Sequence, residues 1–181
     1  SSTYYAPAIA TTTNAIELDV AASGCVNTTF RCSNRGTMTI TFNKPVTNPV
    51  LHLSGMGGNT GGTQSMYHAS LNLTSWTATG TPTLTRVGGN TNFTVTGSEI
   101  RSTTINGGTN CQLAKNAGCG SVRINGTVTS VTFRIDLLMG GTGANPTAAA
   151  VEGFTYTVTT DDDYSDSPAA YQTAPMATHT I

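Results

Sequence analysis

The chain has 181 residues, which is enough for one domain with a full-sized core. Only 9% of the residues are charged and the formal net charge is -1, so the chain lacks the basic field with which proteins hold nucleic acid or an anionic membrane. No apolar run reaches the length of a membrane span, yet 37% of the residues are apolar, which is enough to drive folding. We expect a folded domain with no nucleic-acid partner and no membrane insertion.

Apolar and polar residues alternate with a period of two along most of the chain, as in strands that bury one face. In chain order the alternating stretches are 16–20, 37–42, 51–53, 71–73, 93–95, 122–128, 131–137 and 154–159. Turn signals rich in glycine and asparagine separate them, at 34–36, 88–90, 106–108 and 145–146. Asn125-Gly126 interrupts one stretch and fits either a tight turn or a strand glycine. The best candidate for a helix, 147–152, is short.

This pattern predicts an all-β protein with little or no helix, in which about eight to ten strands form an antiparallel β-sandwich. Alternation stops at residue 161, where three aspartates begin a polar segment. We expect residues 1–160 to form the sandwich and residues 161–181 to be an acidic linker or the first strand of a following domain. Because the chain starts without methionine and stops at Ile181 with no natural ending, we expect it to be a piece of a larger surface protein.

Four cysteines, Cys25, Cys32, Cys111 and Cys119, occur without a Cys-x-x-Cys motif. Their even number favours disulfides formed in an oxidising, extracellular compartment. The most local pairing joins Cys25 to Cys32 and Cys111 to Cys119, so that each bond closes one loop; the two other pairings remain open. Spacings of seven and eight residues do not fit a zinc site.

The chain offers few groups for catalysis. It has no Gly-x-Ser-x-Gly motif and no carboxylate next to its three histidines in sequence. The carboxylates of the main body are Glu17, Asp19, Glu99, Asp136 and Glu152. We expect them to be solvated on strand faces rather than paired for glycoside hydrolysis. The prediction is a protein without catalytic residues and without an organic cofactor.

Two glycine-rich loops, 57–62 and 140–146, are candidates for ligand recognition, because binding groups often lie on the loops of a rigid sandwich. Amide, hydroxyl and aromatic side chains in and after these loops suit the hydroxyls and C–H faces of sugars. The candidate ligand-binding residues are Asn59, Thr60, Gln64, Tyr67, His68 and Asn145. The same loops fit equally well as connections without a ligand.

The acidic tail is a candidate calcium site. Asp161, Asp163 and Asp166, together with Ser165, place oxygen atoms at the close spacing that a hard cation favours. An EF-hand is excluded, because its glycine and glutamate positions hold Asp166 and Gln172. A bound Ca²⁺ would fix the tail against the domain, and a solvated acidic linker explains the pattern equally well.

Two stretches resemble segments of bacterial surface proteins. Residues 42–58, Phe-Asn-Lys-Pro-Val-Thr-Asn-Pro-Val-Leu-His-Leu-Ser-Gly-Met-Gly-Gly, resemble part of the lectin-like non-repetitive domain of CshA-type fibrillar adhesins. Residues 163–169 resemble the Asp-Tyr-Gly-Asp-Ala-Pro segment that recurs in long surface proteins, with Ser165 and Ser167 in place of glycine and alanine. The first resemblance implies a lectin-like or jelly-roll sandwich over about residues 15–160, near the tip of an adhesin.

Three functional hypotheses follow. The leading one is a monomeric adhesion module on the cell surface that binds a host or microbial glycoprotein or glycan, as the resemblance implies. The second is a structural spacer of a surface fibril, which needs no concave polar site. The third is a carbohydrate-active enzyme, which requires two carboxyl groups about 5–9 Å apart in a cleft.

Overall fold

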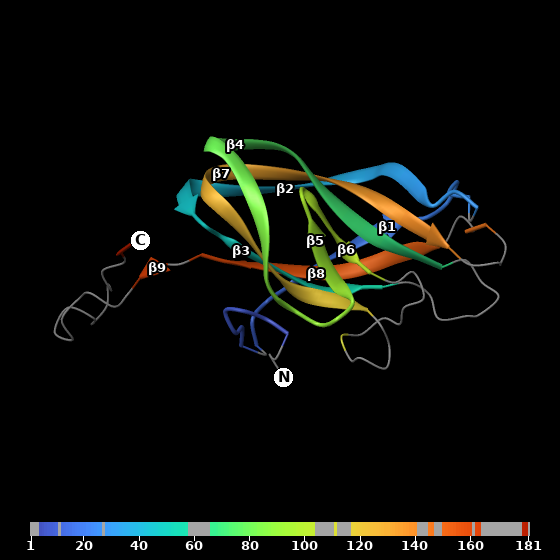
Figure 1. The fold of residues 1–181 in the computed structure, drawn as a ribbon, viewed down its shortest axis with the longest axis horizontal. Coiled ribbons are helices and arrows are strands. Elements are labelled where there is room, and N and C mark those ends of the chain that lie inside the picture. Colours follow the sequence, from blue (N-terminus) through green and yellow to red (C-terminus); the bar gives the residue numbers. More distant parts are fainter. Residues whose placement is uncertain are drawn as a thin grey trace.

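The computed structural model describes residues 4–10, 12–26, 28–57, 66–103, 111, 117–140, 145–146, 150–160, 162–163 and 179–180 (Figure 1). Within them the chain is all β and every strand pairing is antiparallel, which confirms the predicted class. The strands are β1 (Ile16–Ala21), β2 (Arg31–Thr47), β3 (Val50–Met56), β4 (Met66–Gly89), β5 (Phe93–Thr96), β6 (Glu99–Ser102), β7 (Gly118–Gly140), β8 (Val151–Thr159), β9 (Asp162–Asp163) and β10 (His179–Thr180).

The described residues contain no helix. Val151 and Glu152, at the end of the stretch that we considered for a helix, belong to β8. No apolar helix long enough to cross a bilayer occurs in the described part of the chain.

One eight-stranded sheet follows the order β1-β8-β3-β7-β4-β6-β5, and β2 also pairs with β7. β4 accompanies β7 along nearly its whole length, so the two long ribbons run side by side across the molecule in Figure 1. The other edge of β7 pairs first with β3 and then with β2. The sheet therefore has two halves, one built on β1, β8 and β3 and the other on β2, β6 and β5, with β4 and β7 in both.

β7 bends where it passes from one half to the other. Gly126 has a φ of +119°, which strongly favours glycine, and the registers of β2 and β4 shift opposite this point. The side chain of Asn48 accepts a hydrogen bond from the Gly126 amide at 2.9 Å, and the Asn48 amide donates to the Gly126 carbonyl at 2.9 Å. Asn125-Gly126 is therefore a strand glycine at a bend.

The predicted turn at 34–36 is wrong. These residues lie inside β2, where the register with β7 shifts between Cys32 and Gly36. Asn34 adopts a φ of 59°, and its backbone amide donates to Asp136 Oδ1 at 2.8 Å. The turn-like sequence thus encodes a β-bulge, because a carboxylate on the neighbouring strand holds the extra residues in place.

The two halves of the sheet share one hydrophobic core. It contains side chains from both, and the largest of them are fully buried: Leu51, Leu53, Leu71, Ile100, Phe133, Leu137 and Phe154. Each such side chain contributes about 1.5–3 kcal/mol to folding. Burial of alternate residues leaves the intervening polar side chains on the outer faces of the sheet, where both candidate sites lie.

Beyond the main sheet, β9 and β10 pair as a separate two-stranded sheet, with His179 opposite Asp163. This pairing joins the two ends of the tail. The domain boundary near residue 160 stays a prediction.

Candidate functional site

A recess of about 230 Å³ lies between the N-terminal segment and the outer faces of β3 and β8. Its floor is made by polar side chains on these two paired strands, His52 and Ser54 from β3 and Thr155 and Thr157 from β8. Tyr5, Ile9 and Thr13 of the N-terminal segment also line it. We call this feature the recess; its lining residues contain hydroxyl, imidazole and aromatic groups but no carboxylate, lysine or arginine.

His52 fixes the floor of the recess. Its side chain is 2% exposed, with Nδ1 at 2.8 Å from Ser121 Oγ and Nε2 at 2.8 Å from Thr159 Oγ1. Burial lowers the pKa of His52 below its usual value, because a low-dielectric environment disfavours the imidazolium. The ring is therefore neutral at physiological pH and held in one orientation.

The N-terminal segment is anchored over this floor. The Ala6 amide donates to Ser121 Oγ at 3.0 Å, and the Tyr5 ring meets the His52 ring edge-to-face at 5.9 Å between centroids. A side chain at Gly88 would clash, since its Cβ would lie 3.0 Å from the Tyr4 carbonyl oxygen. Glycine at this position lets the N-terminal segment approach β4 closely.

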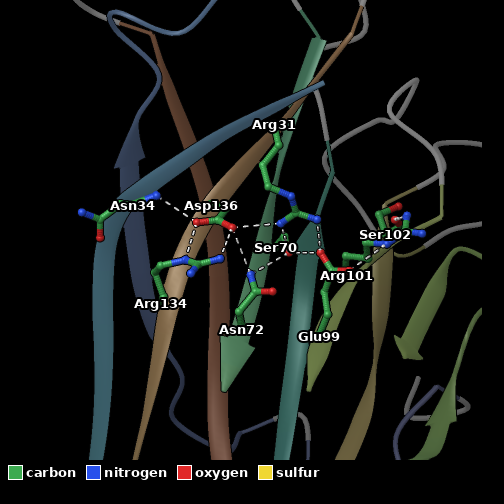
Figure 2. Close-up of polar contacts among 9 residues, drawn as sticks. All are labelled: Arg31, Asn34, Ser70, Asn72, Glu99, Arg101, Ser102, Arg134 and Asp136. Atoms are coloured by element: carbon green, nitrogen blue, oxygen red, sulfur yellow. Dashed lines mark hydrogen bonds and ion pairs between the residues drawn. The ribbon is translucent and has the colours of Figure 1, made fainter. Parts of the chain in front are cut away.

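A second polar cluster lies on the outer face of β2, β4, β6 and β7 (Figure 2). We call it the charged network; it consists of Arg31, Glu99, Arg101, Arg134 and Asp136. Arg31 links both carboxylates, with Nη1 at 2.9 Å from Asp136 Oδ2 and Nη2 at 2.6 Å from Glu99 Oε1. Arg134 donates to both Asp136 oxygens at 2.8 Å, and Arg101 lies 3.6 Å from Glu99.

Neutral neighbours complete the charged network. Ser70 donates to Glu99, and Asn72 donates to Asp136 Oδ2 at 3.3 Å (Figure 2). Burial alone would raise the pKa of both carboxyl groups. For Asp136, contacts with Arg134, the Asn34 amide and Arg31 outweigh burial, and for Glu99, contacts with Ser70 and Arg31 do so. The pKa of each is lowered, so both are ionised at neutral pH.

The carboxylates only partly match the prediction that all are solvated. Glu17 and Asp19 are exposed and Glu99 is half-buried, but Asp136 and Glu152 are buried. Glu152 Oε1 accepts backbone hydrogen bonds from Gly57 at 3.1 Å and Ala69 at 3.3 Å, and burial raises its pKa well above the usual range. Glu152 stands two residues before Phe154 and therefore shares the core face of β8, and this period-two spacing is the sequence signal that indicates its burial.

Tyr67 and His68 are not loop residues. Both lie in β4, after the first glycine-rich loop, where Tyr67 is 7% exposed and His68 is fully buried, and their role in ligand binding stays a prediction. Burial, with the charge of Arg101, lowers the pKa of His68 to about 4. The charge of Glu99 and the nearby Ser102 backbone oppose this shift, and neither ring nitrogen meets the geometry of a hydrogen bond with the described residues.

The other candidate site residues lie mostly outside the described residues. These are Asn59, Thr60, Gln64, Asp161 and Asp166. Asn145 is described and exposed, and Asp163 is described only as a residue of β9. No group of three metal-ligating side chains occurs within the described ranges, and the calcium site stays a prediction.

The four cysteines form two disulfides, in the most local of the three pairings that the sequence left open. Cys25 and Cys32 join across 5.6 Å between Cα atoms, and Cys111 and Cys119 across 5.4 Å. The second bond borders the recess, since Ser54 Oγ lies 3.1 Å from Cys111 Sγ. Two disulfides indicate that the protein folds in an oxidising environment.

Comparison with known proteins identifies no matching family model, no matching curated protein and no matching solved structure, so the functional argument depends on the sites themselves.

Proposed function

We propose that this chain is an extracellular adhesion module that binds a glycan, with one sugar ring held in the recess. The observation that carries the proposal is the chemistry of the lining: hydroxyls on Ser54, Thr155 and Thr157 stand beside the aromatic ring of Tyr5. Hydroxyl groups donate to and accept from sugar hydroxyls, while an aromatic ring packs against the C–H face of a sugar.

The size of the recess supports a single ring. Its volume of about 230 Å³ is below the roughly 300–1,000 Å³ of pockets that enclose drug-sized ligands. Its polar groups are also preorganised, because His52 is bonded on both ring nitrogens and the N-terminal segment is tied to Ser121. Fixed groups lose little freedom on binding, which favours recognition of a small ligand.

The adhesion hypothesis accounts for these features better than the two alternatives. A spacer domain does not require a preorganised polar recess. A glycosidase requires one carboxyl group whose raised pKa lets it act as an acid, next to an ionised partner. The described residues that line the recess include no carboxyl group, and the Glu99 and Asp136 pair of the charged network has both pKa values lowered.

The resemblance of residues 42–58 to CshA-type adhesins supports a place on a bacterial cell surface, and the two disulfides fit an extracellular setting. The partner we propose is a host or neighbouring-cell glycoprotein or glycan. Its attachment function would come from many such domains displayed together, because the affinity of a single sugar ring is weak.

A glycan array followed by NMR titration with the monosaccharides of the bound glycans tests the proposal. We expect the ring signals of His52 to shift on binding, and Tyr5→Ala to weaken binding about tenfold or more through loss of the stacking ring. Tyr5→Phe keeps the ring and should bind like the wild type. Thr79→Ala, at an exposed position of β4, is the control. An array without bound glycans, or binding that Tyr5→Ala leaves unchanged, would refute the recess as the site.

A further inference from the structure

We propose that the charged network is a second binding site, which holds the carboxylate group of an acidic glycan between Arg134, Arg31 and Arg101. This site lies on the outer face of the β2 half of the sheet, whereas the recess lies on the outer face of β3 and β8. The inference is therefore independent of the proposed function of the recess.

The order of charges along the network leaves arginines at both ends. From one end to the other the ion pairs join Arg134, Asp136, Arg31, Glu99 and Arg101. Three guanidiniums and two carboxylates give this group a net charge of +1. A chain of alternating charges that begins and ends with a cation has one positive charge in excess, and its two end groups each have only one ionic partner.

The arginine side chains of the charged network are also more exposed than its carboxylates. The side chains of Arg134, Arg31 and Arg101 are 39%, 30% and 30% exposed, whereas those of Asp136 and Glu99 are 0% and 20% exposed. The arginine side chains are thus more exposed to solvent than the two carboxylates, which lie between them in Figure 2. In a chain with only 9% charged residues, this concentration of cations is a distinct feature of the surface.

The end arginines keep N–H groups available for an outside acceptor. Arg134 uses Nε and Nη2 on Asp136, and none of its described contacts uses Nη1. Arg101 uses Nη1 on the Ser102 carbonyl and Nε toward Glu99, and none of its described contacts uses Nη2. Because carboxylates already hold these guanidiniums, an anion binds them with little further loss of side-chain freedom.

His68 lies beside the charged network on the same face of the sheet. It precedes Ser70 by two residues on β4, so the two side chains share the outer face, and His68 pairs with Leu138 next to the pair of Ser70 with Asp136. The ring is fully buried, and neither nitrogen meets the geometry of a hydrogen bond with the described residues. An anion held by Arg101 at the surface would therefore act on the buried ring through its charge and not by direct contact.

His68 also provides a direct readout. The charges of Arg101 and Arg31 both lower its pKa, which shows that the ring is within electrostatic reach of these guanidiniums. An anion bound by them should oppose this effect and raise the pKa of His68 from about 4. His52, buried under the recess, serves as the internal control.

The test titrates the whole chain with glucuronic acid, with glucose as the same ring without the charge, and with sodium sulfate as the free anion. We expect glucuronic acid and sulfate to raise the pKa of His68 in NMR titrations, sulfate to leave that of His52 unchanged, and glucose to have no effect on His68. Arg134→Gln and Arg101→Gln should each weaken glucuronic acid binding about tenfold. Arg123→Gln, an exposed arginine in the first part of β7, is the matched control.

Thermal melts verify that each variant is folded, and a salt titration of the wild type gives evidence that needs no variant. Glucuronic acid binding should weaken as ionic strength rises, because added ions screen the guanidiniums. Equal binding of glucose and glucuronic acid, an unchanged His68 pKa, or glutamine variants that bind like Arg123→Gln would overturn the proposal. Binding of sulfate without glucuronic acid would also overturn it, since the site would then accept only a free anion. Loss of recess binding in Tyr5→Ala leaves these outcomes unaffected.

Discussion

Asp136 and Glu152 are both buried carboxyl groups, yet their environments change their acidity in opposite directions. Asp136 is 0% exposed and Glu152 is 5% exposed. Asp136 has two guanidiniums and a backbone amide as donors, and its pKa is lowered. Among the described residues Glu152 has only two backbone amides as donors, and its pKa is raised well above the usual range. Burial favours the neutral form in both cases, and the presence of a cation decides the outcome.

The largest effect that this comparison predicts is for Asp136→Ala. The substitution leaves Arg31 and Arg134 without their shared carboxylate, and we expect it to lower the free energy of unfolding by about 3–5 kcal/mol, as for other broken buried ion pairs. Urea denaturation at neutral pH measures the change. Asp19→Ala, at an exposed position of β1, should stay within about 0.5 kcal/mol of the wild type. Equal effects of the two variants would contradict a stabilising role for the network.

Acid should destabilise the half of the sheet that carries the charged network, which is built on β2, β6 and β5. The folded pKa of His68 lies below its ordinary value of 6.5. Between these two pKa values the unfolded chain binds a proton on His68 that the folded chain does not bind. Its contribution to stability is complete above pH 6.5 and is lost as the pH falls toward about 4, with a total of about 3 kcal/mol. Asp136 and Glu99 add to this loss as the pH falls below their ordinary values of 3.8 and 4.5.

The measurement is urea denaturation between about pH 7 and pH 4, on the wild type and on His68→Leu. The variant lacks the titrating ring, so its stability should fall less steeply across this range. His52→Leu is not a suitable control, because it would disturb the recess, and His179→Leu in β10 serves instead. Parallel pH profiles for the wild type and His68→Leu would show that His68 is not the responsible group.

The smallest effect is expected for Glu152→Gln. A neutral amide oxygen can accept the hydrogen bonds from Gly57 and Ala69, so the change near pH 5 should be below about 1 kcal/mol. Because the folded pKa of Glu152 is raised, its contribution to stability is complete below its ordinary value of 4.5 and is lost as the pH rises through the folded pKa.

The wild type should therefore lose stability toward about pH 9 more than Glu152→Gln does, and denaturation curves at both pH values measure the difference. Glu17→Gln, at an exposed position, is the control and should follow the wild type. If the wild type and Glu152→Gln respond equally to alkaline pH, the carboxyl group is not kept neutral by burial.

Local sequence patterns predicted much of the backbone but little of the sites. Alternation identified the stretches that became strands, because a period of two is a property of each strand alone. Asparagine and glycine suggested a turn at 34–36, and the carboxylates at 136 and 152 were expected to be solvated. Both expectations failed. Each depended on a contact with a distant segment, such as the bond from the Asn34 amide to Asp136, which are 102 residues apart.

The sequence by itself determined the all-β class, since alternation acts within a few residues, whereas the pairing of the four cysteines was decided by the tertiary structure. Only the tertiary structure decided how β7 joins the two halves of the sheet, and which polar residues meet there. Arg31, Glu99 and Asp136 stand on three different strands, and Tyr5 reaches His52 from the N-terminal segment. Contacts of this kind depend on strand order and register, which the alternation of side chains along a single strand does not specify.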